Sequence, residues 1–259
     1  MNFISNLFNR NGTIKPEGFP LTLKHIQTIR LAMSVLEMNP EMQMPLASKS
    51  IFDYLNSYFE LDVAYYAHSW QVRMRKDISF DHQKPSVTVG DVTRPLVFPR
   101  QMLAKCRGGW ANTDMITFSG FKTPQRIAAL KQWLKNTYDA DVDLEKEAGY
   151  DDNNVKIVWS SNGRQFPQKA WDVPYYDELL SSGFVLCPDG DFIWTYRFFE
   201  AVICGAIPII ENMCELYEGF YFYDMKTPRE ELIYRPEQAG NNFKLLMQKF
   251  TLPEKTNAR

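Results

Sequence analysis

The stretch that decides the fold is residues 183–212, GFVLCPDGDFIWTYRFFEAVICGAIPIIEN. An apolar run at 184–187, a polar loop, an amphipathic segment and a second apolar run at 207–210 predict a strand, a helix and another strand. Two strands joined through one helix in the same sheet are nearly always parallel, with a right-handed crossover. We therefore expect the ends of both strands and the start of the helix along one edge of the sheet.

Charged residues follow both predicted strands and begin the helix between them. We expect five of them beside a common crevice: Asp189, Asp191, Arg197, Glu200 and Glu211. The planar fork of an arginine matches two phosphate oxygens, and a carboxylate can accept both hydrogen bonds of a ribose diol. This combination suits a ligand that contains a diphosphate and a sugar.

The start of this helix is a predicted anion site. Thr195 is expected to cap the helix, so that Tyr196 and Arg197 lie in the first turn with free backbone N–H groups. The helix dipole contributes about 0.3–1 kcal/mol at an exposed site, whereas a charge-assisted hydrogen bond from the arginine contributes about 1.5–3 kcal/mol. We therefore expect Arg197 to dominate the binding of an anion.

Simpler interpretations fit the same residues. Arg197 and Glu200 have the spacing of a surface ion pair, which is worth about 0.2–0.5 kcal/mol. Residues 189–191 contain the Asp-Gly signature of an ordinary turn. Cys187 and Cys204 fit small buried apolar residues better than nucleophiles, because neither has a histidine nearby in the sequence.

Strand and helix patterns alternate along the rest of the chain, which predicts an α/β fold whose parallel sheet is covered on both faces. The expected helices are 22–38, 50–59, 124–136 and 238–250, and the expected strands are 61–66, 86–89, 115–118, 155–159 and 221–223. The acidic stretch 139–152 is typical of a solvated loop. Prolines and glycines punctuate 92–110, so we predict domains at 1–108 and 109–235, followed by a helix and tail at 236–259.

Composition excludes some classes of partner and site. A formal charge of −2 gives no general attraction for nucleic acid or anionic lipid. The four cysteines include no CxxC pair, and with three histidines they favour neither a zinc site nor a disulfide framework. The apolar run in the first fifteen residues is too short, and too often interrupted, for a signal peptide or a spanning helix. We expect a soluble, cytoplasmic protein without a transmembrane segment.

An ordered set of motifs in the decisive stretch resembles the exostosin-type glycosyltransferases. It consists of Cys-Pro-x-Gly at 187–190, then Arg197, Glu-Ala at 200–201 and Gly-x-Ile-Pro at 205–208. Weaker similarities precede it, in Gly90-Asp91-Val92 with Pro95 and in Phe118-Ser119-Gly120 with Arg126. The resemblance covers about residues 86–224, and the first 85 residues match no family pattern.

The resemblance implies a GT-B architecture, in which two Rossmann-like domains with parallel sheets face an interdomain cleft. The C-terminal domain would bind the nucleotide-sugar donor, with Arg197 on the diphosphate and Glu200 on the ribose, and no metal or other cofactor would be obligatory. The N-terminal domain would be on the acceptor side. Further donor-binding candidates are Asp189, Asp191, Thr195, Tyr196, Arg164 and Glu211.

These features predict a glycosyltransferase that moves a sugar from a nucleoside diphosphate, UDP in the first instance, to a hydroxyl of a saccharide or glycan. An inverting reaction needs a base on that hydroxyl. Asp91 is the first candidate, because we expect it at the interdomain cleft, and His68, which follows the strand expected at 61–66, is the second. Two alternatives stay open: a non-catalytic nucleotide- or glycan-binding module, and another nucleotide-sugar enzyme such as a hydrolase or epimerase.

Overall fold

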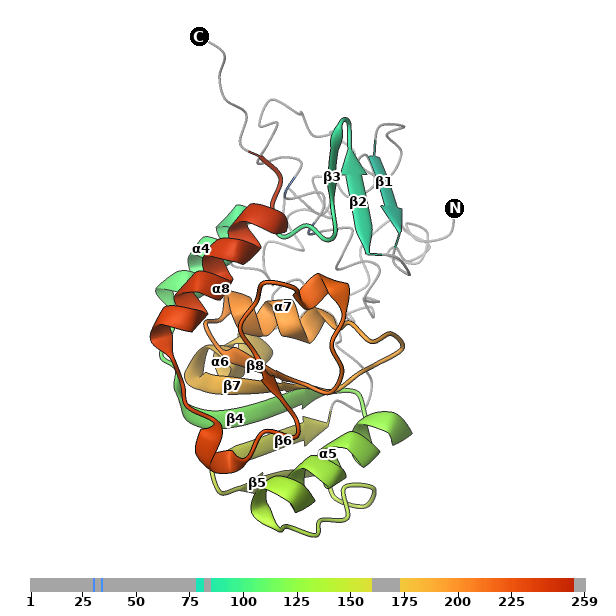
Figure 1. Ribbon diagram of the computed structural model, residues 1–259, viewed down its shortest axis with the longest axis vertical. Helices are drawn as coiled ribbons and strands as arrows, with labels where there is room; N and C mark the ends of the chain where they lie inside the picture. The colour runs from blue at the N-terminus through green and yellow to red at the C-terminus, as the bar shows by residue number, and fades with distance from the viewer. Residues whose placement is uncertain (1–29, 31–33, 35–77, 82–84, 160–172, 254–259) are drawn as a thin grey trace, which may run out of the picture. The chain divides into compact units, whose positions relative to one another are not determined.

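The computed structural model describes residues 30, 34, 78–81, 85–159 and 173–253 of this chain. The chain divides into two compact units (Figure 1): residues 1–100, 164–173 and 250–259 form unit 1, and residues 101–163 and 174–249 form unit 2. Several expected features lie outside the described residues. They are most of the helix at 22–38, the helix at 50–59, the strand at 61–66, His68 and Arg164.

Unit 1 contains an antiparallel sheet of three short strands, β1 (Ile78–Asp81), β2 (Ser86–Val89) and β3 (Val92–Arg94), in the order β1-β2-β3. The prediction of β2 is confirmed, whereas β3 was not expected. A two-residue turn joins β2 to β3. Gly90 in this turn has a φ of 55°, which a residue without a Cβ adopts without strain. The described strands of this unit therefore do not form the parallel sheet that the sequence predicts.

Unit 2 contains a six-stranded sheet in the order β5-β6-β4-β7-β8-β9. Its strands are β4 (Thr113–Gly120), β5 (Gly149–Asp152), β6 (Val155–Trp159), β7 (Ser182–Cys187), β8 (Ile207–Ile210) and β9 (Tyr223–Asp224). All neighbours pair in parallel except β5, which lies antiparallel at one edge. The α/β class predicted from the sequence is confirmed in this unit.

The order of connections creates a switch point in the sheet. From β4 the chain runs through α5 (Pro124–Tyr138) and the edge strand β5 to β6 on one side. It then returns through α6 (Val173–Ser181) to β7 on the other side, and continues through α7 (Tyr196–Ile203) to β8. Ligands of open α/β sheets bind outside the carboxyl ends of the strands at such a point. The expected binding edge in unit 2 is therefore between β4 and β7.

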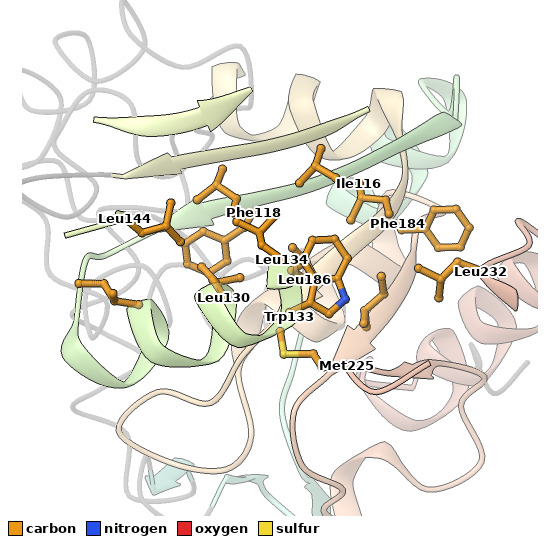
Figure 2. Close-up of a cluster of buried hydrophobic side chains, with 14 of the residues drawn as sticks. Ile116, Phe118, Leu130, Trp133, Leu134, Leu144, Phe184, Leu186, Met225 and Leu232 are labelled. Carbon is orange, nitrogen blue, oxygen red and sulfur yellow. The ribbon is translucent and has the colours of Figure 1, made fainter. Parts of the chain in front are cut away.

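Alternation along β4 sends its side chains to the two faces of the sheet. Ile116 and Phe118 join the core cluster that α5 covers with Leu130, Trp133 and Leu134 (Figure 2). On the opposite face, the hydroxyl of Thr117 donates a hydrogen bond to Glu178 of α6. Strand β7 is buried along its whole length, as expected for a strand covered on both faces.

The structure corrects several boundaries. Part of the acidic stretch forms the edge strand β5 instead of a loop. Helix α4 (Arg100–Gly108) occupies residues that the sequence had assigned to a domain boundary. The last helix, α8, spans Pro236–Lys249, and two single-turn 3₁₀ helices precede it, η2 (Glu215–Tyr217) and η3 (Arg229–Glu231). Within the described residues, no helix is both long enough and apolar enough to cross a bilayer.

Helix α4 was missed because its boundary residues were interpreted as punctuation alone. Pro99 precedes it, and Gly108 and Gly109 end it, which is the usual arrangement at the two ends of a helix. Met102 and Cys106 are four residues apart and both buried, which is the spacing of an apolar helix face. The proline and glycines of this stretch therefore mark the two ends of helix α4.

Candidate functional site

The carboxyl edge of the sheet gathers charged side chains from two loops and two helix starts. They come from the first turn of α5, the loop after β7, the first turn of α7 and the loop after β8. Parallel strands place these segments together at the switch point, because all their carboxyl ends face the same way. The side chains are Arg126, Asp189, Asp191, Arg197 and Glu211.

Arg197 lies in the first turn of α7 and is only 8% exposed. Its Nε and Nη2 both donate to the carbonyl oxygen of Ser119, at 3.0 and 2.8 Å, and its Cζ is 4.2 Å from the ring centroid of Phe118. Its Nη1 is buried and has no hydrogen-bond partner among the described residues. The guanidinium group is therefore held firmly on one side, with one N–H group left to bind something else.

Gly120 makes this position of Arg197 possible. A Cβ at residue 120 would overlap Nη2 and crowd Cζ of the arginine, so any larger residue would displace the guanidinium group. The Phe-Ser-Gly sequence at 118–120 thus supplies a ring face, a carbonyl acceptor and an open space in three consecutive residues. In the sequence this tripeptide is conspicuous only for its resemblance to a family pattern, so its role around Arg197 becomes visible in the structure alone.

Arg126 is a second cation at the same edge, to which the sequence analysis assigned no role. It lies in the first turn of α5, where its Nη1 donates to the carbonyl oxygen of Phe121 at 3.3 Å. Burial, and next the positive charge of Arg197, lower the pKa of Arg126 to about 10, against an opposing effect of Asp191. Its Nε is buried without a hydrogen-bond partner in the described part of the chain.

Glu200 lies one turn deeper in α7 and is fully buried. Its Oε2 accepts a hydrogen bond from the hydroxyl of Tyr175 at 2.7 Å, and its Oε1 accepts one from Tyr176 at 3.0 Å. Both tyrosines belong to α6, so the carboxylate ties two helices together on one face of the sheet. Each carboxylate oxygen thus already accepts one hydrogen bond, which a ribose diol at Glu200 would share with or take from a tyrosine hydroxyl.

The loop after β7 is held by the end of β8. The backbone N–H of Asp189 donates to Oε2 of Glu211 at 3.0 Å, and Nδ2 of Asn212 donates to Oδ2 of Asp189 at 2.8 Å. Burial raises the pKa of Asp189, Glu211 raises it further, and the bond from Asn212 opposes the change. Oδ1 of Asp189 is buried with no hydrogen-bond partner in the residues described, which leaves an acceptor at this edge.

Thr195 caps α7 as the sequence predicts. Its hydroxyl oxygen accepts a hydrogen bond from the N–H of Phe198 at 3.4 Å, and its own N–H donates to the hydroxyl of Tyr217 at 2.8 Å. Tyr217 also stacks on Phe198 with 3.9 Å between ring centroids, and burial raises the pKa of its hydroxyl. Tyr217 was missed by the sequence analysis, because nothing local links it to the helix start.

Thr195→Ala is expected to lower the free energy of unfolding by about 1 kcal/mol, because an N-cap oxygen is lost and no cavity of consequence forms. Urea denaturation followed by circular dichroism measures the change. Thr195→Ser keeps the oxygen and is expected to stay within about 0.5 kcal/mol of the unmodified chain. Equal losses in both variants would show that packing of the methyl group, and not the cap, stabilises this helix start.

The remaining candidates from the sequence lie in different surroundings. Tyr196 is half-buried and packs edge-on against Trp194, with 4.9 Å between ring centroids, and Asp191 is exposed. Asp91 is exposed in the turn between β2 and β3 of unit 1. Cys187 is buried, which raises the pKa of its thiol to about 12. In the described ranges, no three His, Cys, Asp or Glu side chains are placed to hold a metal ion.

Comparisons with known proteins point to the same part of unit 2. Residues 154–219 match the family described as the RXYLT1 C-terminal domain. Ribitol-5-phosphate xylosyltransferase 1 from Mus musculus is 38% identical over 65 residues, which are 24% of this chain and 15% of that protein. No solved structure was found to match the chain. The family match spans α7, β8 and the loop after β7, and so includes Arg197, Glu200 and Asp189.

Proposed function

We propose that this protein is a glycosyltransferase that moves a sugar from a nucleoside diphosphate to a hydroxyl of a saccharide or glycan. The observation that carries the proposal is the buried Nη1 of Arg197, an N–H group without a partner among the described residues at the start of α7. The similarity of this region to a xylosyltransferase supports it independently. UDP is the proposed nucleotide, and the relative's name makes xylose the first sugar to test.

The proposed reaction breaks the bond between the anomeric carbon and the oxygen of the terminal phosphate. Negative charge develops on the departing diphosphate, and Arg197 with the positive end of the α7 dipole would stabilise it. The acceptor oxygen forms the new bond to the anomeric carbon and loses its proton to a base. Asp91 is the proposed base and His68 the second choice. We propose the reaction without an obligatory metal.

The other polar groups at this edge have proposed roles in holding the donor. The unpartnered Oδ1 of Asp189 would accept a hydrogen bond from a hydroxyl of the transferred sugar, while Glu211 keeps the loop in place. The hydroxyl of Tyr175 lies on Glu200, so it would take part in any contact with the ribose. A GT-B arrangement, with the acceptor on the N-terminal domain, remains part of the proposal.

The test is to incubate the full chain with a panel of UDP- and GDP-sugars, UDP-xylose first, with and without saccharide acceptors. Acceptors should include a ribitol phosphate glycan, because the relative's name contains ribitol 5-phosphate. Free nucleotide and extended glycan are measured separately. Extension with release of one nucleotide per sugar is the expected result.

Other outcomes identify the alternatives. Nucleotide binding without turnover on any acceptor would indicate a binding module, and nucleotide release without extended glycan would indicate a hydrolase. A changed sugar on an intact nucleotide would indicate an epimerase. Each of these results would contradict the proposed transfer.

A further inference from the structure

Two guanidinium groups bind carbonyl oxygens of one short stretch of backbone, where β4 ends. Arg197 donates to the carbonyl of Ser119 and Arg126 donates to the carbonyl of Phe121, two residues further along the chain. The two groups are close enough that the charge of Arg197 lowers the pKa of Arg126. Like charges brought together away from water destabilise one another unless an opposite charge lies nearby.

An acidic side chain from the loop after β7 compensates this arrangement only partly. Asp191 raises the pKa of Arg126, but its effect is smaller than those of burial and Arg197, and its side chain is exposed to solvent. In contrast, Lys135 at the other end of α5 has an ordinary surface ion pair with Asp139. The two arginines are therefore arranged differently from Lys135.

Each arginine also keeps one buried N–H group without a partner in the described structure, Nη1 of Arg197 and Nε of Arg126. Buried donors are nearly always hydrogen-bonded, and an unsatisfied one destabilises the folded state by about 1–3 kcal/mol. Two unsatisfied donors on adjacent cations have a common explanation, which is an anion that accepts from both.

Glycines keep the space around both groups open. A Cβ at residue 120 would overlap the guanidinium of Arg197, and a Cβ at residue 190 would lie 2.7 Å from Nη2 of Arg126. Gly190 does not have a positive φ, so its backbone conformation does not require glycine. What a glycine provides at this position is space for the guanidinium group of Arg126. Gly120 at the end of β4 and Gly190 in the loop after β7 thus leave room for the two guanidinium groups.

We propose that Arg126 and Arg197 form a two-arginine clamp for phosphoryl oxygens, with Arg126 as a second phosphate-binding residue and Gly190 as the residue that positions it. Two planar forks can donate hydrogen bonds to the several oxygens of a diphosphate, whereas one fork matches two oxygens. Assignment of the anion to the donor's diphosphate rests on the proposed function. A phosphate monoester on the acceptor would present the same kind of oxygens. The choice of probes in the binding experiment distinguishes these two anions.

The experiment measures binding of UDP, inorganic pyrophosphate and ribose 5-phosphate to the full chain by calorimetry, in four forms of the protein. The unmodified chain and Lys135→Gln, which removes an equal charge from the far end of α5, are expected to bind alike. Arg126→Gln is expected to weaken binding of UDP and pyrophosphate roughly ten- to a hundredfold. Gly190→Ala keeps both charges but displaces a guanidinium, so a smaller loss is expected.

Thermal unfolding without ligand separates this role from a structural one. Removing the charge of Arg126 relieves a repulsion, so Arg126→Gln is expected to unfold at the same temperature as the unmodified chain or higher, yet to gain less stability from pyrophosphate. A loss confined to ribose 5-phosphate would support the clamp and assign its anion to the acceptor. Unchanged binding of every probe by Arg126→Gln, or no binding by the unmodified chain, would overturn the clamp.

The two proposals can fail separately. A chain that binds pyrophosphate through both arginines but transfers no sugar would retain the clamp and lose the proposed function. A chain that transfers sugar with Arg197 essential and Arg126 dispensable would retain the function and lose the clamp.

Discussion

Arg197→Gln is expected to weaken binding of UDP roughly ten- to a hundredfold and to lower turnover by at least as much, because a charge-assisted hydrogen bond contributes about 1.5–3 kcal/mol. The charge on the diphosphate increases as the sugar leaves, so the loss in the transition state should be at least as large as the loss in binding. Calorimetry with UDP and steady-state rates with the preferred donor measure the two effects.

Arg197→Lys refines this prediction. A lysine keeps the charge, but a single ammonium group cannot both bind the Ser119 carbonyl through two N–H groups and present a third to the ligand. We therefore expect Lys to restore only part of the affinity. Arg107→Gln is the matched control, because Arg107 also lies over an aromatic ring, 3.8 Å from the centroid of Trp110, but belongs to α4. Unchanged UDP affinity in Arg197→Gln would contradict the assignment.

Glu200→Ala is expected to lower the free energy of unfolding by about 2–5 kcal/mol, because the substitution deprives two buried tyrosine hydroxyls of an acceptor and each such loss costs about 1–3 kcal/mol. The site is fully buried, so water replaces the carboxylate poorly. Chemical denaturation with fluorescence detection measures the change in the free energy of unfolding. The lost hydrogen bonds are those that join α6 to α7.

Glu200→Gln separates the structural role of this residue from a role in binding. The amide keeps one acceptor oxygen, so a smaller loss of stability is expected than with alanine. Tyr175→Phe and Tyr176→Phe should each remove one of the two bonds and leave the carboxylate in place. A folded Glu200→Gln protein with unchanged affinity for UDP would exclude direct contact with the ribose, and a Glu200→Ala protein as stable as the unmodified chain would contradict the structural role.

Local sequence patterns predicted the elements at the binding edge. The bounds of β6 and β8 agree with the predicted strands at 155–159 and 207–210, and α7 begins after its predicted cap, Thr195. Gly205 has a φ of 77°, as expected where a helix ends and a strand begins. These features follow from short-range physics, because apolar periodicity, capping oxygens and backbone freedom act within a few residues.

The same local patterns could not predict which residues meet across the fold. Arg126 is 71 residues before Arg197 in the chain, and no periodicity relates them. Their proximity follows from the sheet order, which places β4 beside β7. The spacing of Arg197 and Glu200 fits two residues that bind one ligand, or a surface ion pair. In the structure Arg197 binds a backbone carbonyl, whereas Glu200 binds two tyrosine hydroxyls.

The sequence by itself determined that the chain between Phe184 and Ile210 forms a strand, a capped helix and a strand, with an arginine in the first helical turn. Only the tertiary structure decided that Arg197 has a neighbour in Arg126 and that the carboxylate of Glu200 is enclosed by tyrosines. The physical reason is that secondary structure depends on interactions between residues close in the chain. Burial, and the electrostatics that depend on it, are set by residues that the sheet brings together from far apart.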